Sequence, residues 1–149
     1  MIVYFDTSAI VKRYIKETGS REVNALLNDE NTIPGSVIIT QVEMAAALQK
    51  SIYVTNASAK ILPVIWQDFM NDWKLFTRIQ ISTDMIEKAS QIALTHKLRG
   101  YDSLHLAAAL LWQESLKESI TLATFDRDLW FAGQKAGTKV WPEGLVEVK

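Results

Sequence analysis

Residues 1–11 read MIVYFDTSAIV. The apolar run 2–5 predicts a buried strand, and this strand ends directly at an acid, Asp6. Two short polar residues follow before the apolar pattern resumes, as at the start of a helix. Asp6 therefore either caps a helix or belongs to a functional site, and this stretch alone does not decide between the two.

The composition predicts one ordinary globular domain covering residues 1–149. A chain of 149 residues with 48% hydrophobic and 22% charged residues can bury a sizeable core. Its net charge of −1 gives no overall attraction for nucleic acid, so a polyanionic partner would need a local basic patch. The absence of cysteine excludes disulfides, thiolate zinc sites and cysteine nucleophiles.

No segment has the pattern of a signal peptide or a membrane span. The longest unbroken apolar run, LAAALLW at 106–112, is far shorter than the ~18 residues that a transmembrane helix needs. We therefore expect a cytoplasmic protein without a membrane partner.

Short β-rich runs alternate with longer helical patterns along the whole chain. The expected strands are 2–5, 36–40, 78–81, 120–124 and 138–141. The expected helices lie near 8–17, 21–29, 41–54, 58–76, 84–98, 102–117 and 127–136. This alternation predicts an α/β fold, a three-layer α/β/α sandwich around a central, mostly parallel sheet of about five strands.

One helical pattern carries a broad aromatic stripe. Its members recur at helical spacing and are Leu62, Ile65, Trp66, Phe69, Trp73 and Phe76. Such a stripe favours the core, but aromatic residues are also enriched at dimer and partner interfaces. Both interpretations stay open at this point.

Acids recur at the ends of strands and the beginnings of helices. Asp6 ends the first strand, Glu43 follows the second, Asp102 opens a helix, and Asp126 and Asp128 follow the fourth strand. Each has a structural alternative, because a short carboxylate can cap a helix. For Glu43 the alternative is a capping box, since TQVE at 40–43 has the T-x-x-E pattern.

Taken together, these acids predict a metal site. The carboxyl ends of parallel strands meet at one sheet edge, so Asp6, Glu43 and Asp126 are expected to lie near one another, with Asp102 placed less securely because a helix leads into it. Carboxylates this close need a positive charge between them. Oxygen ligands without cysteine favour Mg²⁺ or Mn²⁺, which support hydrolysis of a phosphodiester.

Other kinds of site are less well supported. His96 and His105 are nine residues apart and lack a third ligand for zinc, and His105 is expected to be structural. No serine-hydrolase or nucleotide-binding motif occurs. An aspartyl phosphotransferase would need a second acid two residues after Asp6, where the chain has Ser8.

Four blocks, in order, carry a resemblance to a known family: YFDTSAIVKRYIKE, TQVEMAAAL, RGYDSLHLAAAL and LATFDRDLWFAGQKAG. Together they resemble the PIN-domain family of metal-dependent ribonucleases, most closely the small VapC-type toxins. The resemblance implies a Mg²⁺- or Mn²⁺-dependent endoribonuclease, an antitoxin protein as partner, and a homodimer. A non-catalytic RNA-binding or scaffold module on the same fold is the alternative.

The resemblance also assigns roles to residues of this chain. The catalytic acids would be Asp6, Glu43, Asp102 and Asp126, of which Asp6, Asp102 and Asp126 would bind the metal ion. Ser8, Thr124 and Asp128 would orient these groups.

Basic side chains near the acids are candidate contacts for the phosphates of RNA: Lys12, Arg13, Arg99 and Arg127. A solvated charged face is the alternative for them. A single-stranded region of RNA would reach such a pocket more easily than a paired helix.

Overall fold

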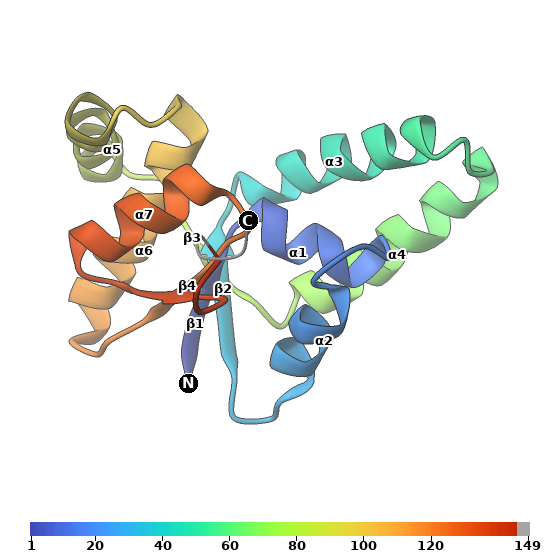
Figure 1. Cartoon of the computed structure of the whole chain (residues 1–149), viewed down its shortest axis with the longest axis horizontal. Helices are drawn as coiled ribbons and strands as arrows, with labels where there is room; N and C mark the ends of the chain where they lie inside the picture. The colour runs from blue at the N-terminus through green and yellow to red at the C-terminus, as the bar shows by residue number, and fades with distance from the viewer. Residues whose placement is uncertain (146–149) are drawn as a thin grey trace.

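The architecture, taken from a computed structural model that describes residues 1–145, is a five-stranded parallel sheet (Figure 1). The strands are β1 (Ile2–Phe5), β2 (Ile33–Val37), β3 (Thr77–Ile79), β4 (Thr121–Ala123) and β5 (Lys139–Trp141). Their order is β3-β2-β1-β4-β5, and every neighbouring pair is parallel. The predicted α/β class and the parallel sheet are confirmed.

Helices connect successive strands, as parallel pairing requires. Between β1 and β3 lie α1 (Thr7–Tyr14), α2 (Ser20–Asn28), α3 (Thr40–Val54), the short 3₁₀ helix η1 (Ala59–Ile61) and α4 (Leu62–Trp73). After β3 come α5 (Thr83–His96), α6 (Gly100–Leu116) and α7 (Arg127–Ala136).

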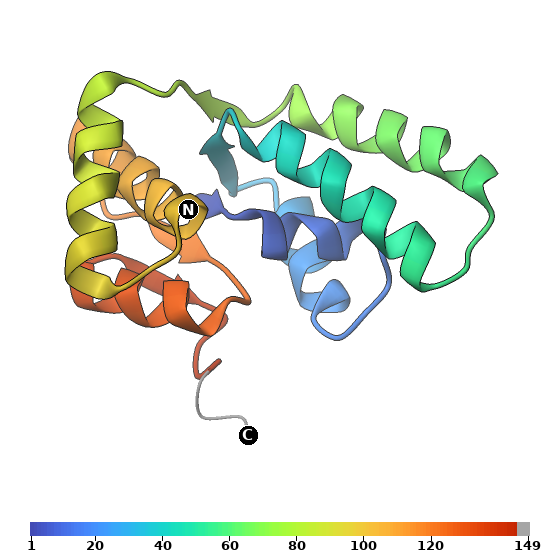
Figure 2. The same ribbon diagram turned by 90° about the horizontal axis from the view of Figure 1, so that it is seen from above.

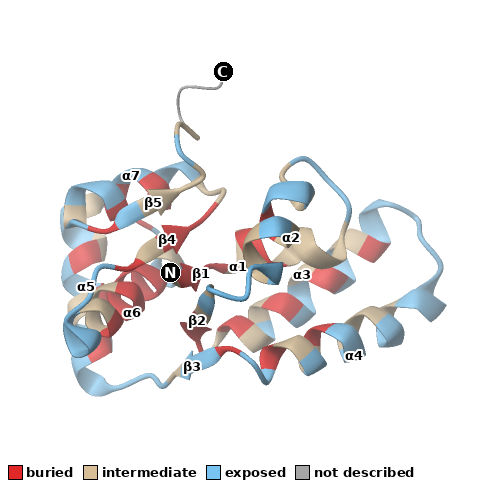
Figure 3. Ribbon diagram, turned by 90° about the horizontal axis from the view of Figure 1, so that it is seen from below, coloured by how far each residue is buried: buried red, intermediate tan, exposed pale blue. Residues whose placement is uncertain are grey.

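The helices form one layer on each face of the sheet (Figures 1 and 2). The alternation of side chains in β1 shows this: Tyr4 packs with residues of α5, α6 and α7, whereas Val3 and Phe5 pack with residues of α1, α3 and α4. Buried residues accordingly gather on the helix faces turned toward the strands (Figure 3). The predicted three-layer arrangement is therefore confirmed.

The aromatic stripe of α4 belongs mainly to the core. Phe69, Trp73 and Phe76 are buried, and Trp66 packs against the same cluster while partly exposed. Trp73 lies between two rings, with centroid distances of 5.6 Å to Phe69 and 5.3 Å to Phe76. The core interpretation of this stripe holds for its C-terminal half.

Most predicted bounds differ from the observed ones by one to three residues, and two predicted elements differ more. The second strand spans Ile33–Val37 rather than 36–40, and the predicted helix 58–76 divides into η1 and α4. Pro63 lies in the first turn of α4, where proline is tolerated because the first N–H groups have no partner inside the helix. No helix among residues 1–145 is long and apolar enough to span a membrane.

Candidate active site

Asp6 connects the end of β1 to the start of α1 and is 3% exposed. Its carboxylate accepts hydrogen bonds from the backbone N–H of Ala9 (3.0 Å), the hydroxyl of Ser8 (2.7 Å) and the hydroxyl of Thr124 (2.7 Å). Asp6 is thus the N-cap of α1 and also the meeting point of two polar side chains. Thr124 follows β4, so these bonds tie the carboxyl ends of the neighbouring strands β1 and β4 together.

Glu43 projects from the first turn of α3 toward a buried histidine. His105 Nε2 donates to Glu43 Oε1 over 2.6 Å, and Thr7 Oγ1 donates to the same oxygen over 3.1 Å. On the other side of the imidazole, Nδ1 lies 2.8 Å from the hydroxyl of Tyr4. A chain of side chains from Tyr4 through His105 therefore holds the carboxylate of Glu43.

This arrangement overturns the capping-box interpretation of residues 40–43. Ile39, not Thr40, is the N-cap residue of α3, and no side chain caps that helix. The hydroxyl of Thr40 lies 2.7 Å from the hydroxyl of Ser36, and Glu43 reaches across to α6 instead of back to its own helix.

Asp102 and Asp126 share one guanidinium group. Arg99 Nε donates to Asp102 Oδ2, and the Arg99 terminal nitrogen Nη2 donates to Asp126 Oδ2, both over 3.1 Å. Asp126 also caps α7 by accepting from the N–H of Leu129, whereas Asp102 lies in the first turn of α6 without being its cap. The Arg99 side chain is 81% exposed, so solvent screens both ion pairs.

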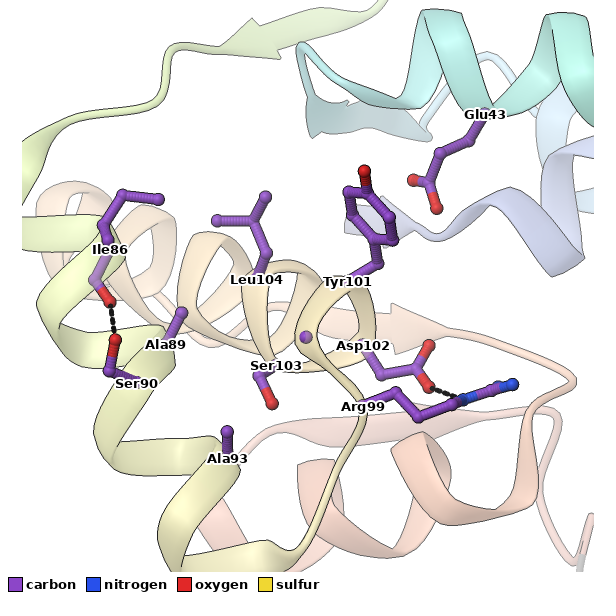
Figure 4. A pocket seen from close by; sticks show the side chains of 11 residues that line it. Glu43, Ile86, Ala89, Ser90, Ala93, Arg99, Tyr101, Asp102, Ser103 and Leu104 are labelled. Carbon is purple, nitrogen blue, oxygen red and sulfur yellow. Dashed lines mark hydrogen bonds and ion pairs between the residues drawn. The ribbon is translucent and has the colours of Figure 1, made fainter.

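A groove of about 670 Å³ opens beside these acids, between α5 and the start of α6 (Figure 4). Ile86 and Ala89 of α5 and Leu104 of α6 give it apolar walls. Glu43 and Asp102 both line it, although they come from different helices and from segments far apart in the chain. Glu43 and Asp102 are therefore accessible from this groove.

The pKa shifts show how these groups influence one another. Burial raises the pKa of Asp6 and outweighs the lowering effects of the His105 charge and of the hydrogen bonds. Burial and the neighbouring Asp126 raise the pKa of Asp102 despite Arg99. Burial alone would raise the pKa of Glu43, but the hydrogen bond and charge of His105 and the bond from Thr7 lower it.

His105 lies at the centre of this charge distribution. Burial would lower its pKa, but the hydrogen bond to Glu43 and the charges of Asp6, Glu43 and Asp102 raise it. The charges of Asp6, Glu43 and Asp102 all act on His105, so these three carboxylates lie near the same imidazole. Sequence reasoning treated His105 as structural and overlooked Thr7; the usable signal was that His105 follows Asp102 by one helical turn.

Two of the predicted phosphate contacts form ion pairs with other side chains of the chain. Lys12 bonds Glu17 at 3.0 Å and lies over the ring of Phe125. Arg13 bonds Asp72 at 2.9 Å and also contacts side chains of α2. Arg99 is the predicted cation that lies directly among the acids.

The remaining two predicted residues, Arg127 and Asp128, lie exposed on the first turn of α7 beside Asp126. Neither forms a side-chain hydrogen bond with the part of the chain described here, residues 1–145. The structure therefore brings Asp6, Glu43, Asp102 and Asp126 together with Ser8 and Thr124, and their roles remain predictions.

The donor chemistry of the acids fits a hard divalent cation, but their present arrangement does not form a finished metal site. Within residues 1–145, no three Asp, Glu or His side chains are grouped closely enough to hold a metal ion. The guanidinium of Arg99 instead bonds both Asp102 and Asp126. Because this side chain is largely exposed, it can leave the carboxylates at little cost, and oxygen ligands are those that Mg²⁺ and Mn²⁺ prefer.

A family model described as PIN domain matches residues 3–132, a range that contains all four acids. The chain belongs to the PIN-domain family. The resemblance inferred from the four sequence blocks is thereby confirmed.

Two relatives align with this PIN-domain chain over nearly its whole length. Proteins named Ribonuclease VapC45 and Ribonuclease VapC49, from Mycobacterium tuberculosis strains CDC 1551 / Oshkosh and ATCC 25618 / H37Rv, are each 30% identical to it over 146 residues. The alignment covers 97% of this chain and 97% of each relative. Among solved structures, a chain in a toxin-antitoxin complex from Klebsiella pneumoniae has the same fold, with a TM-score of 0.62, 22% identity and coverage of 85% of this chain and 88% of that chain.

Proposed function

We propose that this PIN-domain protein is a Mg²⁺- or Mn²⁺-dependent endoribonuclease that acts as the toxin of a type II toxin-antitoxin pair. The observation that carries the proposal is that four acids lie near one another at the carboxyl edge of the sheet, where Arg99 joins Asp102 to Asp126 and one groove is lined by Glu43 and Asp102. The relatives named as VapC ribonucleases support it, because they align along almost the full chain. A cytoplasmic location is part of the same proposal, since cellular RNA is the substrate.

Three carboxylates would hold the ion: Asp6, Asp102 and Asp126. A bound divalent ion supplies Lewis-acid chemistry, because it makes water more acidic and offsets negative charge on the phosphate. Other side chains of the protein position the catalytic carboxylates. Ser8 and Thr124 fix both oxygens of Asp6, and Glu43 faces the same space as a base for the attacking water.

The proposal is tested by following cleavage of a single-stranded RNA by the purified chain. We expect cleavage with Mg²⁺ or Mn²⁺, at least about a hundredfold slower cleavage with EDTA, and full recovery when excess metal is added back. Cleavage that is equally fast in EDTA would contradict metal dependence. RNA binding without cleavage under all conditions would favour the non-catalytic RNA-binding module instead.

A second prediction concerns the hydrogen bonds that hold Glu43. Replacing His105 by Ala removes the 2.6 Å bond to Glu43, so the carboxylate gains freedom to leave its position. We expect kcat for RNA cleavage to fall about 10- to 100-fold with little change in KM, as is typical when the partner of a functional group is lost. Steady-state kinetics on one RNA substrate measures both constants.

The control for this prediction is His105→Gln, whose amide N–H can still donate toward Glu43. We expect this variant to recover a large part of kcat although both variants disturb the same buried position. Melting curves recorded for both proteins separate this effect from loss of the fold. Equal losses of kcat in the two variants would show that His105 serves packing alone.

The partner is also part of the proposal. A solved toxin-antitoxin complex whose chain shares this fold supports an antitoxin that binds this protein. An arginine of such a partner could pair with the acids in place of Arg99, because a guanidinium fits two carboxylates. We also propose that the protein forms a homodimer.

A further inference from the structure

A second groove is lined by residues just before Arg99 and by residues of α7. It encloses about 420 Å³ between the C-terminal end of α5 and the outer face of α7. His96 and Lys97 line it from the α5 side, and Asp128, Phe131 and Lys135 line it from α7. We call it the α5–α7 groove.

The lysines of this groove are available for a ligand, in contrast to Lys12 and Arg13. Lys97 and Lys135 are exposed, and neither forms an ion pair with any residue in the range 1–145. The acid that lines the groove, Asp128, offsets one of the two positive charges. A ligand that spans both lysines therefore meets a net positive surface on a protein whose overall charge is −1.

The groove is also lined by an aromatic ring in addition to its two lysines. Phe131 is 43% exposed, and it lies one helical turn before Lys135 on α7. An exposed ring beside unpaired cations is the combination that binds unpaired nucleobases, because every base can stack on an aromatic ring while its phosphates contact the cations. A paired RNA helix presents no free base faces to such a ring.

Residues that line the groove are close in sequence to residues of the candidate active site. Asp128 is two residues after Asp126, and Lys97 is two residues before Arg99. From Asp126 to Lys135, α7 extends the site by roughly 13 Å along its axis.

From these observations we infer that the α5–α7 groove binds the single-stranded RNA segment next to the phosphodiester that is cut. Lys97 and Lys135 contact backbone phosphates of that segment, and one of its bases stacks on Phe131. The inference rests on the proposed function and adds to it the path of the substrate away from the acids. It replaces Lys12 and Arg13 by Lys97 and Lys135 as the main phosphate contacts.

The test measures binding separately from cleavage. Fluorescence anisotropy follows a short fluorescein-labelled oligouridylate in EDTA, so that cleavage does not interfere. We expect Lys97→Glu with Lys135→Glu to weaken binding at least about tenfold and to reduce the slope of log affinity against log salt by about 1.4, the value for two lost phosphate contacts on single-stranded nucleic acid. Phe131→Ala should weaken binding at least about fivefold without changing that slope.

The matched control is Lys50→Glu with Lys60→Glu. It changes the net charge by the same amount at two exposed lysines of α3 and η1, at the opposite end of the molecule from α5 and α7 (Figure 1). We expect its RNA affinity to stay within about twofold of wild type, because contacts beyond a Debye length are screened. Lys97 has a positive φ of +56°, a backbone conformation that Asn tolerates. Lys97→Asn with Lys135→Gln is therefore a second variant that removes both charges with less backbone strain.

The outcomes separate this inference from the proposed function. If the wild type cuts RNA with Mg²⁺ but the groove variant and the control variant lose equal affinity, the role of the groove is overturned and the proposed function stands. A wild type that neither binds nor cuts RNA would overturn both. Binding that depends on Lys97, Lys135 and Phe131 in a protein that does not cut would support the groove and contradict the nuclease.

Discussion

Asp102→Asn is expected to reduce RNA cleavage at least about a hundredfold while leaving the fold intact. The substitution keeps the size of the side chain but removes the negative charge that would hold the metal ion. A hundredfold slower reaction corresponds to the loss of about 3 kcal/mol of transition-state stabilisation. Asp102 is half-buried, and its side-chain hydrogen bond goes to the exposed Arg99. We therefore expect the free energy of unfolding to change by less than about 1 kcal/mol, the size of a lost interaction with the helix dipole.

Asp84→Asn is the matched control for this substitution. Asp84 is also an acid in the first turn of a helix, but it is exposed and lies outside the acid cluster. Isothermal titration with Mn²⁺ supplies a second measurement: metal affinity should fall for Asp102→Asn and not for Asp84→Asn. A variant at Asp102 that cuts RNA at the wild-type rate would remove this residue from the proposed mechanism.

Trp73→Ala is expected to cost about 3–5 kcal/mol of the free energy of unfolding, the usual range for truncating a buried tryptophan. Trp73 is fully buried between two aromatic rings, and its indole N–H donates to Gln41 over 3.1 Å. The substitution opens a cavity where α4 packs on α3 and leaves the Gln41 oxygen without this partner. Urea denaturation at a fixed protein concentration measures the change.

Trp66→Ala provides the comparison within the same helix. Trp66 is only partly buried, so we expect a loss of about 1–2 kcal/mol, since less apolar area returns to water. If the two substitutions destabilise the chain equally, then Trp73 does not have the core role described here. A loss at Trp66 that grows with protein concentration would instead identify its side of α4 as a contact between subunits.

The fold could be predicted from the sequence because short apolar runs and stretches of helical periodicity alternate along the chain. Each strand is a short apolar run and each connection has helical periodicity, so β1 and α7 were predicted with their observed bounds, 2–5 and 127–136. The second strand was misplaced because it contains Pro34 and Gly35, which sequence rules place outside strands. Pro34 precedes the part of β2 that pairs with β3, which begins at Gly35.

Only the three-dimensional structure shows why glycine is required at position 35. A Cβ atom at this position would lie 2.4 Å from the ring of Trp112, so glycine is needed for the close approach of α6 to the sheet. The two residues are 77 positions apart by their numbers, 112 and 35. No local pattern links them, and this explains the error in the strand prediction.

The acids of the site could be predicted for a topological reason, but their partners could not. Strand ends meet at one edge in any parallel sheet, whereas the pairing of Glu43 with His105 depends on how α3 and α6 face each other. In the same way, the spacing of Lys12 and Arg13 does not show that Glu17 and Asp72 lie beside them. Side-chain partners from distant segments are the information that the sequence pattern lacks.

Asp6 holds more of the scaffold together than Asp102 does, and this difference matters when related chains are compared. Because Asp6 caps α1 and joins the ends of β1 and β4, a relative that has lost catalysis still benefits from an acid at this position. Among residues 1–145, the side chain of Asp102 bonds only the exposed Arg99 and caps no helix. If the proposed function is correct, an acid retained at position 102 is therefore a better indicator of nuclease activity in a relative than an acid retained at position 6.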